Sequence, residues 1–199
     1  GLGDITYVTV ASGGVFAKFS HEFQTLTPAG EDTVFVSREN GIAINKEIYS
    51  EGLAQELGLN PEELTEEKAT EVGNIFNLGT RFSHALGLQY ADVEGSKHDI
   101  IMGSYGIGPA RVMGTLVEQF ATDEGIVWPE AVAPFQVHLL TLGADTSVNE
   151  EGNSLYEELV KAGIEVLFDD REGLSNGEKL VESDLIGCTY RVIISQKSL

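Results

Sequence analysis

Short apolar runs separated by polar and glycine-rich turns occupy the first part of the chain, a pattern that predicts β-strands. One strand is expected within residues 1–12, and two more are expected at 23–26 and 33–37. Residues 28–32, between the last two, contain a proline and a glycine and have the composition of a turn. We therefore expect these two strands to form an antiparallel hairpin.

The next stretch, residues 46–71, is rich in glutamate with scattered leucines. It predicts one or two short surface helices, the second opened by Pro61. The many carboxylates indicate a solvated face rather than a catalytic pair or a metal site. Further along, residues 71–78 predict a strand, 80–86 a helix capped by its first residue, and 87–99 a loop.

Residues 97–134 combine a strand, a glycine-rich turn and a helix. The apolar run 100–104 predicts the strand, glycines at 103, 106 and 108 mark the turn, and Pro109 fits the first helical position. Apolar residues then recur at helical spacing, which predicts that one face of the helix is buried. The residues of this face are Val112, Met113, Leu116, Val117 and Phe120.

Arg111 lies off this apolar face, in the first turn of the expected helix. The helix macrodipole is positive there, so a cation is unfavourable by up to ~1 kcal/mol unless an anion binds beside it. Glycine-rich turns that lead into helices present backbone N–H groups to phosphate, and a guanidinium adds paired hydrogen bonds. The local pattern fits a phosphate site, and it also fits an ordinary surface arginine beside a glycine turn.

Prolines at 129 and 134 mark a domain boundary, after which the pattern changes. Apolar runs now alternate with amphipathic segments, which is typical of a small parallel α/β unit. Strands are expected at 135–142, 164–168 and 190–194, and helices at 149–162 and 177–186. The expected domains are residues 1–132 and 133–199.

The 199 residues carry a formal net charge of −20, and 42% of them are hydrophobic. That apolar content suffices for a core. A surface this acidic repels nucleic acid at long range. Any contact with RNA must therefore be local or be made by parts outside this chain. A surface that keeps the protein soluble explains the acidity equally well.

Cys188 is the only cysteine, which excludes an intrachain disulfide or a thiolate metal cluster and fits a reducing cytosol. Neither His84 nor His98 has the spacing of a metal ligand, so no metal site is expected. No apolar run approaches the ~20 residues of a membrane span, and the start lacks the pattern of a signal peptide. We expect a soluble, cytoplasmic protein without a membrane partner.

Several blocks of sequence occur in an order that is specific to one enzyme family. They are GGVFAKFSHEFQTLTPAGEDT, EVGNIFNLGTRFS, GSYGIGPARVMGTLVEQ, DEGIVWPEAVAPFQVHLL, VLFDDREGL and SDLIGCTYRVIISQKSL. Together they resemble the bacterial-type prolyl-tRNA synthetases, and they cover most of the chain apart from the acidic segment 46–70. The class II synthetases for threonine, histidine and glycine share this architecture and are the nearest alternatives.

The resemblance implies an α+β fold. It consists of an incomplete class II synthetase catalytic core, with an antiparallel sheet and helices, followed by a small, truncated α/β anticodon-binding domain. The third motif of the family corresponds to residues 99–121. The linker 46–70 is far too short for the editing domain that many bacterial relatives insert there, so editing in cis is not expected. The first and second motifs are not found, which indicates an inactive fragment of a longer enzyme.

For the whole enzyme, the resemblance implies that ATP and proline form a prolyl-adenylate and that proline is then attached to tRNA(Pro). Mg²⁺ would accompany ATP, and the enzyme would be a homodimer. Arg111 is the expected catalytic residue, and Arg111, Gly108 and Glu71 would bind ATP. Two alternatives stay open: a non-catalytic binding or regulatory paralogue of a class II synthetase, and an unrelated nucleotide-binding enzyme that shares only the glycine turn.

By the same resemblance, the proline site would be lined by Glu22, Gly73, Asn74, Phe76, Ser104 and Gly106. His21 and Glu22 point to opposite sides of a strand. We favour Glu22, because a carboxylate can pair with the ammonium of proline; a solvated pair on an edge strand is the alternative. Phe76 would form an apolar wall for the pyrrolidine ring. Bacterial relatives commonly have histidine where this chain has Asn74, which can still donate and accept hydrogen bonds.

Asp169, Asp170 and Arg171 follow the second strand of the C-terminal unit, at its carboxyl end, where open α/β sheets usually bind ligands. The resemblance places the reading of the proline anticodon here, since carboxylates accept from base amino groups and arginine reads guanine. Lys179 would add a phosphate or base contact.

Overall fold

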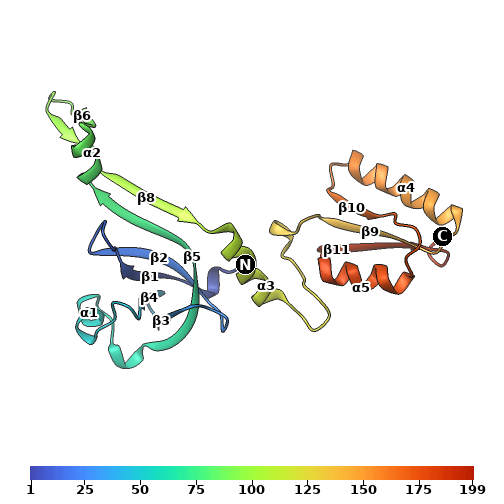
Figure 1. The fold of residues 1–199 in the computed structure, drawn as a ribbon, viewed down its shortest axis with the longest axis horizontal. Helices are drawn as coiled ribbons and strands as arrows, with labels where there is room; N and C mark the ends of the chain where they lie inside the picture. The colour runs from blue at the N-terminus through green and yellow to red at the C-terminus, as the bar shows by residue number, and fades with distance from the viewer. The chain divides into compact units, whose positions relative to one another are not determined.

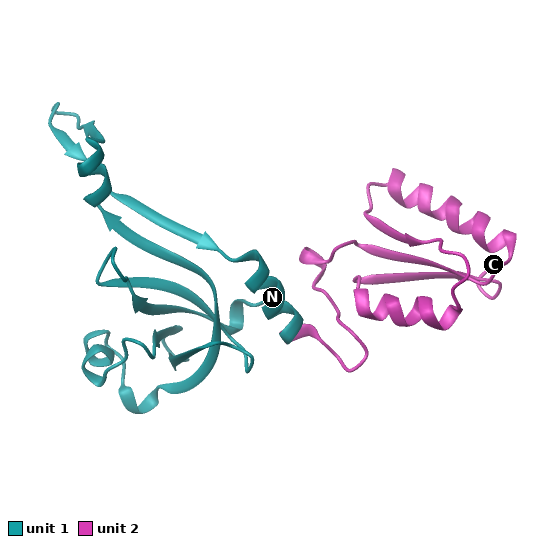
Figure 2. Cartoon of the chain, in the orientation of Figure 1, with its two compact units in different colours: residues 1–118 teal, residues 119–199 magenta.

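The structure is a computed structural model that describes all residues 1–199. The chain divides into two compact units, residues 1–118 and residues 119–199 (Figure 2). The expected domain boundary between residues 132 and 133 lies inside the second unit, because the segment before it is bonded to the last helix of that unit. As a division between domains it stays a prediction.

Unit 1 is built around a six-stranded sheet (Figure 1). Its strands are β1 (Thr6–Ser12), β2 (Phe19–Leu26), β3 (Asp32–Ser37), β4 (Ile42–Asn45), β5 (Thr65–Gly79) and β8 (Met102–Ile107). Its α-helices are α1 (Glu51–Glu56), α2 (Arg81–Leu86) and α3 (Pro109–Phe120), with 3₁₀ turns at Gly3–Ile5 and Pro61–Glu63. A separate hairpin pairs β6 (Gln89–Ala91) with β7 (Lys97–Asp99).

The first five strands pair into a closed ring, in the order β1, β2, β5, β3, β4 and back to β1. The long strand β5 makes this closure: Ala69 pairs with β3 on one edge and with β2 on the other. Further along, β5 pairs with β8. The expected hairpin of β2 with β3 is therefore wrong, because each of the two strands pairs with β5 instead.

Two apolar clusters fill unit 1. One joins β1, β3, β4 and β5 and consists of Tyr7, Val34, Val36, Ala43 and Ala69. The other packs α1 and the turn after it onto β4 and consists of Ile44, Ala54 and Leu59. The short helical elements expected between residues 46 and 71 are thus confirmed, and Pro61 opens the second of them as a 3₁₀ turn.

Helix α3 begins at Pro109, as expected, but its apolar face is only partly buried. Leu116 is 6% exposed, whereas Met113 is 56% and Val117 38% exposed. The expectation of a fully buried face is wrong, because the residues of unit 1 cover only the side of Thr115 and Leu116. The spacing of apolar residues predicted the helix correctly. It did not predict how much of the helix surface is covered by the rest of this chain.

The expected loop at 87–99 is also wrong, because β6 and β7 pair there. Asp92 makes the turn: its Oδ1 accepts from the backbone N–H groups of Glu94 and Ser96, each at 2.9 Å. Gly95 completes it with a φ of +83°, a conformation that favours glycine.

Unit 2 is a three-stranded parallel sheet in the order β10, β9, β11. Its elements are β9 (Val137–Leu142), α4 (Thr146–Lys161), β10 (Val166–Asp169), α5 (Asn176–Ile186) and β11 (Tyr190–Ser195). Figure 1 shows α4 and α5 on opposite sides of this sheet. Leu139, Val148 and Ile194 form its core. All five expected elements and the parallel arrangement are confirmed.

The segment that enters unit 2 is bonded to the end of α5. Trp128 donates from its indole Nε1 to the carbonyl of Ile186 at 3.0 Å. Gly187 ends α5 with a φ of +68°, and a side chain there would overlap the backbone of Ile126. A glycine at this helix end therefore serves both the turn and the close approach of the segment. No helix of the structure is both long and apolar enough to cross a membrane.

Candidate functional site

Five of the six residues expected at the proline site lie in two rows across three neighbouring strands. Glu22 on β2 is opposite Asn74 on β5, which is opposite Gly106 on β8. Two positions further along, Phe76 is opposite Ser104. Because side chains alternate along strands, these residues share one face of the sheet. The structure thus brings them together as the sequence predicted, while their contact with proline stays a prediction.

A β-bulge in β5 adds Glu71 to the same face. Phe23 pairs with Gly73 and Gln24 pairs with Glu71, so the residue between the last two has no partner on β2. As a result, Asn74 Nδ2 donates to Glu71 Oε1 at 2.9 Å. At Gly73, a Cβ would lie only 2.8 Å from the carbonyl oxygen of the neighbouring strand, so this close strand approach requires glycine.

The start of α3 adjoins this face. The backbone N–H of Gly108 donates to the carbonyl of Val72 at 2.9 Å and fixes the glycine turn against β5. Arg111 then reaches back over the turn. Its Nη1 lies 2.9 Å from Glu71 Oε2, and its Nη2 lies 3.3 Å from Glu31 Oε1. These carboxylates offset the unfavourable position of a cation in the first turn of a helix.

A pocket of about 320 Å³ opens at this corner. It is lined by residues 71–74 of β5 and by residues 106–111, which run from the end of β8 through Gly108 into α3; Glu71 and Arg111 are among them. The side chain of Arg111 is half exposed. The pocket therefore combines a cation, a glycine turn and nearby carboxylates, which is a chemistry suited to a phosphate together with an amine or a metal ion.

Glu22 is held by amides that the sequence reasoning missed. Its Oε2 accepts from Gln24 Nε2 at 2.9 Å and from Asn45 Nδ2 at 3.3 Å. Burial raises the pKa of Glu22 above its ordinary value, and the carboxylates of Glu71 and Asp32 add to the rise. Strand alternation could have identified Gln24, two residues from Glu22. Asn45 and Asp32 come close only through closure of the ring.

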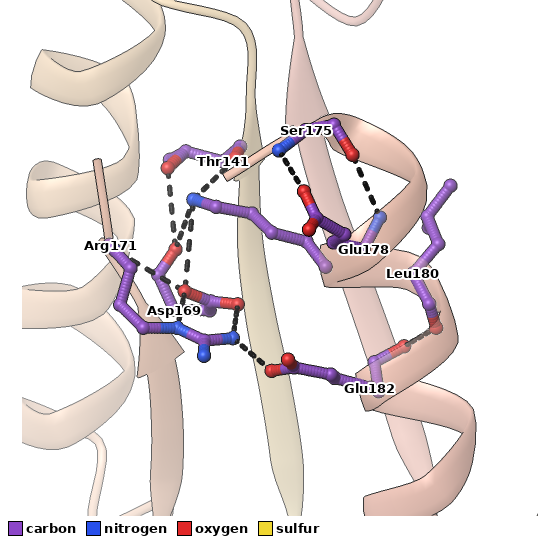
Figure 3. Close-up of polar contacts among 9 residues, drawn as sticks. Thr141, Asp169, Arg171, Ser175, Glu178, Leu180 and Glu182 are labelled. Carbon is purple, nitrogen blue, oxygen red and sulfur yellow. Dashed lines mark hydrogen bonds and ion pairs between the residues drawn. The ribbon is translucent and has the colours of Figure 1, made fainter. Parts of the chain in front are cut away.

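The candidate site of unit 2 centres on Asp169, at the carboxyl end of β10 (Figure 3). The Asp169 carboxylate accepts from Arg171 Nε at 2.8 Å and from Arg171 Nη2 at 2.7 Å. Arg171 also donates to Glu182 Oε2 at 2.6 Å. The hydrogen bonds from Arg171 hold the pKa of Asp169 below its ordinary value. Asp169 is 5% exposed, and its carboxylate orients Arg171. A contact of Asp169 with the anticodon stays a prediction.

Lys179 lies inside unit 2, with its residue 4% exposed. Its Nζ donates to the carbonyl oxygens of Thr141 and Asp169, each at 3.1 Å, and lies 3.7 Å from Asp169 Oδ1. The ammonium therefore joins the ends of β9 and β10. A contact of Lys179 with phosphate or a base stays a prediction.

A larger cavity, of about 820 Å³, lies at the carboxyl ends of these two strands. It is lined by Thr141, Gly143, Ala144, Asn149, Lys179 and residues 170–176. Its rim is ordered by a capping box, in which Ser175 and Glu178 exchange side-chain and backbone hydrogen bonds at the start of α5 (Figure 3). Asp170 is exposed here, unlike Asp169. The cavity thus offers polar groups of both signs to a ligand.

Acid should destabilise unit 2 through Asp169. Its folded-state pKa lies below the ordinary value of 3.8, so the stability that it contributes is complete above that value. This stability is lost as the pH falls through the lower folded-state pKa. As the pH falls below about 4, Asp169→Asn should therefore lose less stability than the wild type. Urea unfolding followed by the fluorescence of Trp128, the only tryptophan, measures this difference.

Asp170→Asn is the matched control, since this neighbouring carboxylate is exposed. It should keep the acid sensitivity of the wild type. If Asp169→Asn and the wild type were equally sensitive to acid, Asp169 would not be the group through which acid destabilises unit 2.

Comparison with known proteins shows what this chain is similar to. Residues 136–199 match the anticodon binding domain family. A proline–tRNA ligase of Moorella thermoacetica is 43% identical over 137 residues, which are 68% of this chain and 24% of the relative. One of Burkholderia pseudomallei is 44% identical over 134 residues, or 66% of this chain and 23% of the relative. The chain thus spans about a quarter of the length of the curated relatives that it matches.

A solved structure shows the same fold. The prolyl-tRNA synthetase of Giardia lamblia, in complex with prolyl-adenylate, has a TM-score of 0.60 and 21% sequence identity to this chain. The match covers 92% of this chain and 30% of the other. The expected fold, an incomplete class II synthetase core followed by an anticodon-binding domain, is confirmed. The resemblance of this chain to the bacterial-type prolyl-tRNA synthetases is confirmed as well, because the bacterial relatives that match two thirds of it are proline–tRNA ligases.

Proposed function

We propose that the full-length product of this gene attaches proline to tRNA(Pro) through a prolyl-adenylate. The observation that carries the proposal is the row of Glu22, Asn74 and Gly106, which ends beside the pocket of Arg111. A carboxylate for the ammonium of an amino acid and a cation for phosphate then share one face of a sheet. Amino-acid activation needs both, because it joins a carboxylate to the α-phosphate of ATP.

In this proposal Glu22 pairs with the ammonium of proline, and Phe76 borders the pyrrolidine ring. Gly73 and Ser104 complete the site along β5 and β8. Arg111 leaves Glu71 and Glu31 to bind the phosphates of ATP. These two carboxylates would then be the residues available to hold the Mg²⁺ that accompanies ATP, which would neutralise phosphate charge. Catalysis then rests on positioning and charge stabilisation rather than on a covalent protein nucleophile.

Unit 2 reads the anticodon in this proposal. Asp170 and Arg171 line the cavity at the carboxyl ends of β9 and β10 and meet the bases, whereas Asp169 and Lys179 hold the rim in place. The support is the match of residues 136–199 to an anticodon binding domain. Because the chain has a net charge of −20, contact with tRNA must be local. The enzyme acts in the cytoplasm and as a homodimer, as the resemblance implies.

Proline-dependent ATP–pyrophosphate exchange tests this function. The full-length gene product should exchange with proline and not with threonine, histidine or glycine, the substrates of the related synthetases. This 199-residue chain alone should exchange hardly at all. A full-length product that binds tRNA but exchanges with none of these amino acids would reject the ligase in favour of a non-catalytic binding or regulatory protein.

A further inference from the structure

A fully buried glutamine lies beside the carboxylate that we assign to the ammonium of proline. Gln24 is 0% exposed, and its Nε2 donates to Glu22 Oε2 at 2.9 Å and to Asp32 Oδ2 at 2.6 Å. An amide nitrogen carries two hydrogens, so both bonds form at once. Gln24 therefore connects two carboxylates that come from different strands, β2 and β3.

The same side chain has an acceptor without a partner. Gln24 Oε1 is buried and accepts no hydrogen bond, which is unfavourable for a buried polar atom. The opposite orientation of the amide would aim this oxygen at two carboxylates, so the observed one is the better of the two. The amide thus leaves its own oxygen without a hydrogen bond, while its nitrogen holds Glu22 and Asp32 in position.

The surroundings of Glu22 otherwise oppose its charge. Burial raises its pKa, the hydrogen bond from Gln24 lowers it, and Glu71 on β5 raises it. The bond from Asn45 on β4 lowers it and Asp32 on β3 raises it. The charged groups that act on Glu22 are therefore both carboxylates, and only the two amides favour its ionised form. Both amides bind Oε2, so Oε1 keeps its lone pairs for a ligand.

We propose that Gln24 is a positioning residue of the proline site, which fixes the orientation of Glu22 and separates it from Asp32. This inference rests on the proposed function and deepens it. Gln24 does not touch the substrate. It holds Oε2 of Glu22, so that Oε1 meets the secondary ammonium of proline in one defined direction and the carboxylate stays ionised at lower pH.

The test is proline-dependent exchange by the full-length enzyme, measured over a range of pH and of proline concentration. Gln24→Met keeps the volume of the side chain and removes the donor. The KM for proline should rise about tenfold, the usual effect of losing a hydrogen bond to a charged group, while the KM for ATP stays unchanged. The acid limb of kcat/KM for proline should move to higher pH, because Glu22 loses a bond that favours its ionised form.

Asp32→Asn should move the same limb in the opposite direction. It removes a like charge from the neighbourhood of Glu22, while its amide oxygen still accepts from Gln24. The acid limb of kcat/KM for proline should therefore shift to lower pH. If Gln24 had a merely structural role, the acid limb of Gln24→Met would stay at its wild-type pH.

Thr25→Val is the matched control. Thr25 is also fully buried on β2, and the substitution removes one hydrogen bond, the one to Thr6. Thr25 lies on the opposite face of the strand from Gln24. It should leave both KM values and the pH profile unchanged. A wild-type KM for proline together with a wild-type pH profile in Gln24→Met would overturn the inference. Should Gln24→Met not fold, Gln24→Asn, whose shorter amide cannot reach both carboxylates, takes its place in the same assay. A wild-type enzyme without proline-dependent exchange would instead reject the proposed function, and the role of Gln24 with it.

Discussion

Replacing Arg111 by alanine in the full-length protein should lower the rate of proline-dependent ATP–pyrophosphate exchange by about 10²–10³-fold, the usual effect of removing one preorganised group that stabilises transition-state charge. Arg111 is the cation that unit 1 presents at the pocket of the glycine turn. Its present partners, Glu71 and Glu31, are carboxylates, and phosphate oxygens can take their place with the same paired geometry. Arg111→Lys should recover little, since an ammonium cannot make the paired bonds.

Arg38→Ala is the matched control for this loss. Arg38 is also an exposed arginine of unit 1 and pairs with Glu67 at 2.6 Å, but it lies in the turn after β3, outside the pocket of Arg111. It should exchange at the wild-type rate. Neither substitution should change stability by more than about 1 kcal/mol, because exposed ion pairs contribute little. Equal exchange rates for Arg111→Ala and Arg38→Ala would contradict a catalytic role for Arg111.

The sequence predicted unit 2 well, because each of its elements carries its own local signals. Ser175 and Glu178 form a capping box at the start of α5, and Gly187 ends that helix in the left-handed conformation. Gly163, with a φ of +82°, follows α4. Alternating strands and helices allow few arrangements other than a parallel sheet, so local signals were enough to determine the topology.

Unit 1 shows where such reasoning fails. Its strands were found apart from β4, β6 and β7. The pairing of β2 and β3, however, depends on β5, which begins at Thr65 and has a different partner on each edge. No short-range pattern contains that information. Glu31, which pairs with Arg111, lies in a segment that the sequence predicted only as the turn of a hairpin, without any role in the site. The resemblance identified Glu22, Asn74 and Gly106 as candidates, whereas their common face followed only from the register of three strands.

Replacing Lys179 by methionine should destabilise unit 2 by about 3 kcal/mol, the usual cost of breaking a buried charged contact. The carbonyl oxygens of Thr141 and Asp169 would lose their donor, and the Asp169 carboxylate would lose a nearby cation. Urea unfolding of the 199-residue chain, followed by the fluorescence of Trp128, measures the effect. Lys161→Met, in the exposed last turn of α4, is the control and should change stability by less than about 1 kcal/mol.

The same variant separates two roles for Lys179 in tRNA binding by the full-length protein. Its ammonium is already bonded to two carbonyl groups inside unit 2, so it has little capacity left to neutralise a phosphate. Under conditions in which the variant is folded, the slope of log K against log salt concentration should therefore equal that of the wild type. A slope reduced by about one would show that Lys179 releases a counterion from the RNA, and the ammonium would then have to leave its carbonyl partners when tRNA binds.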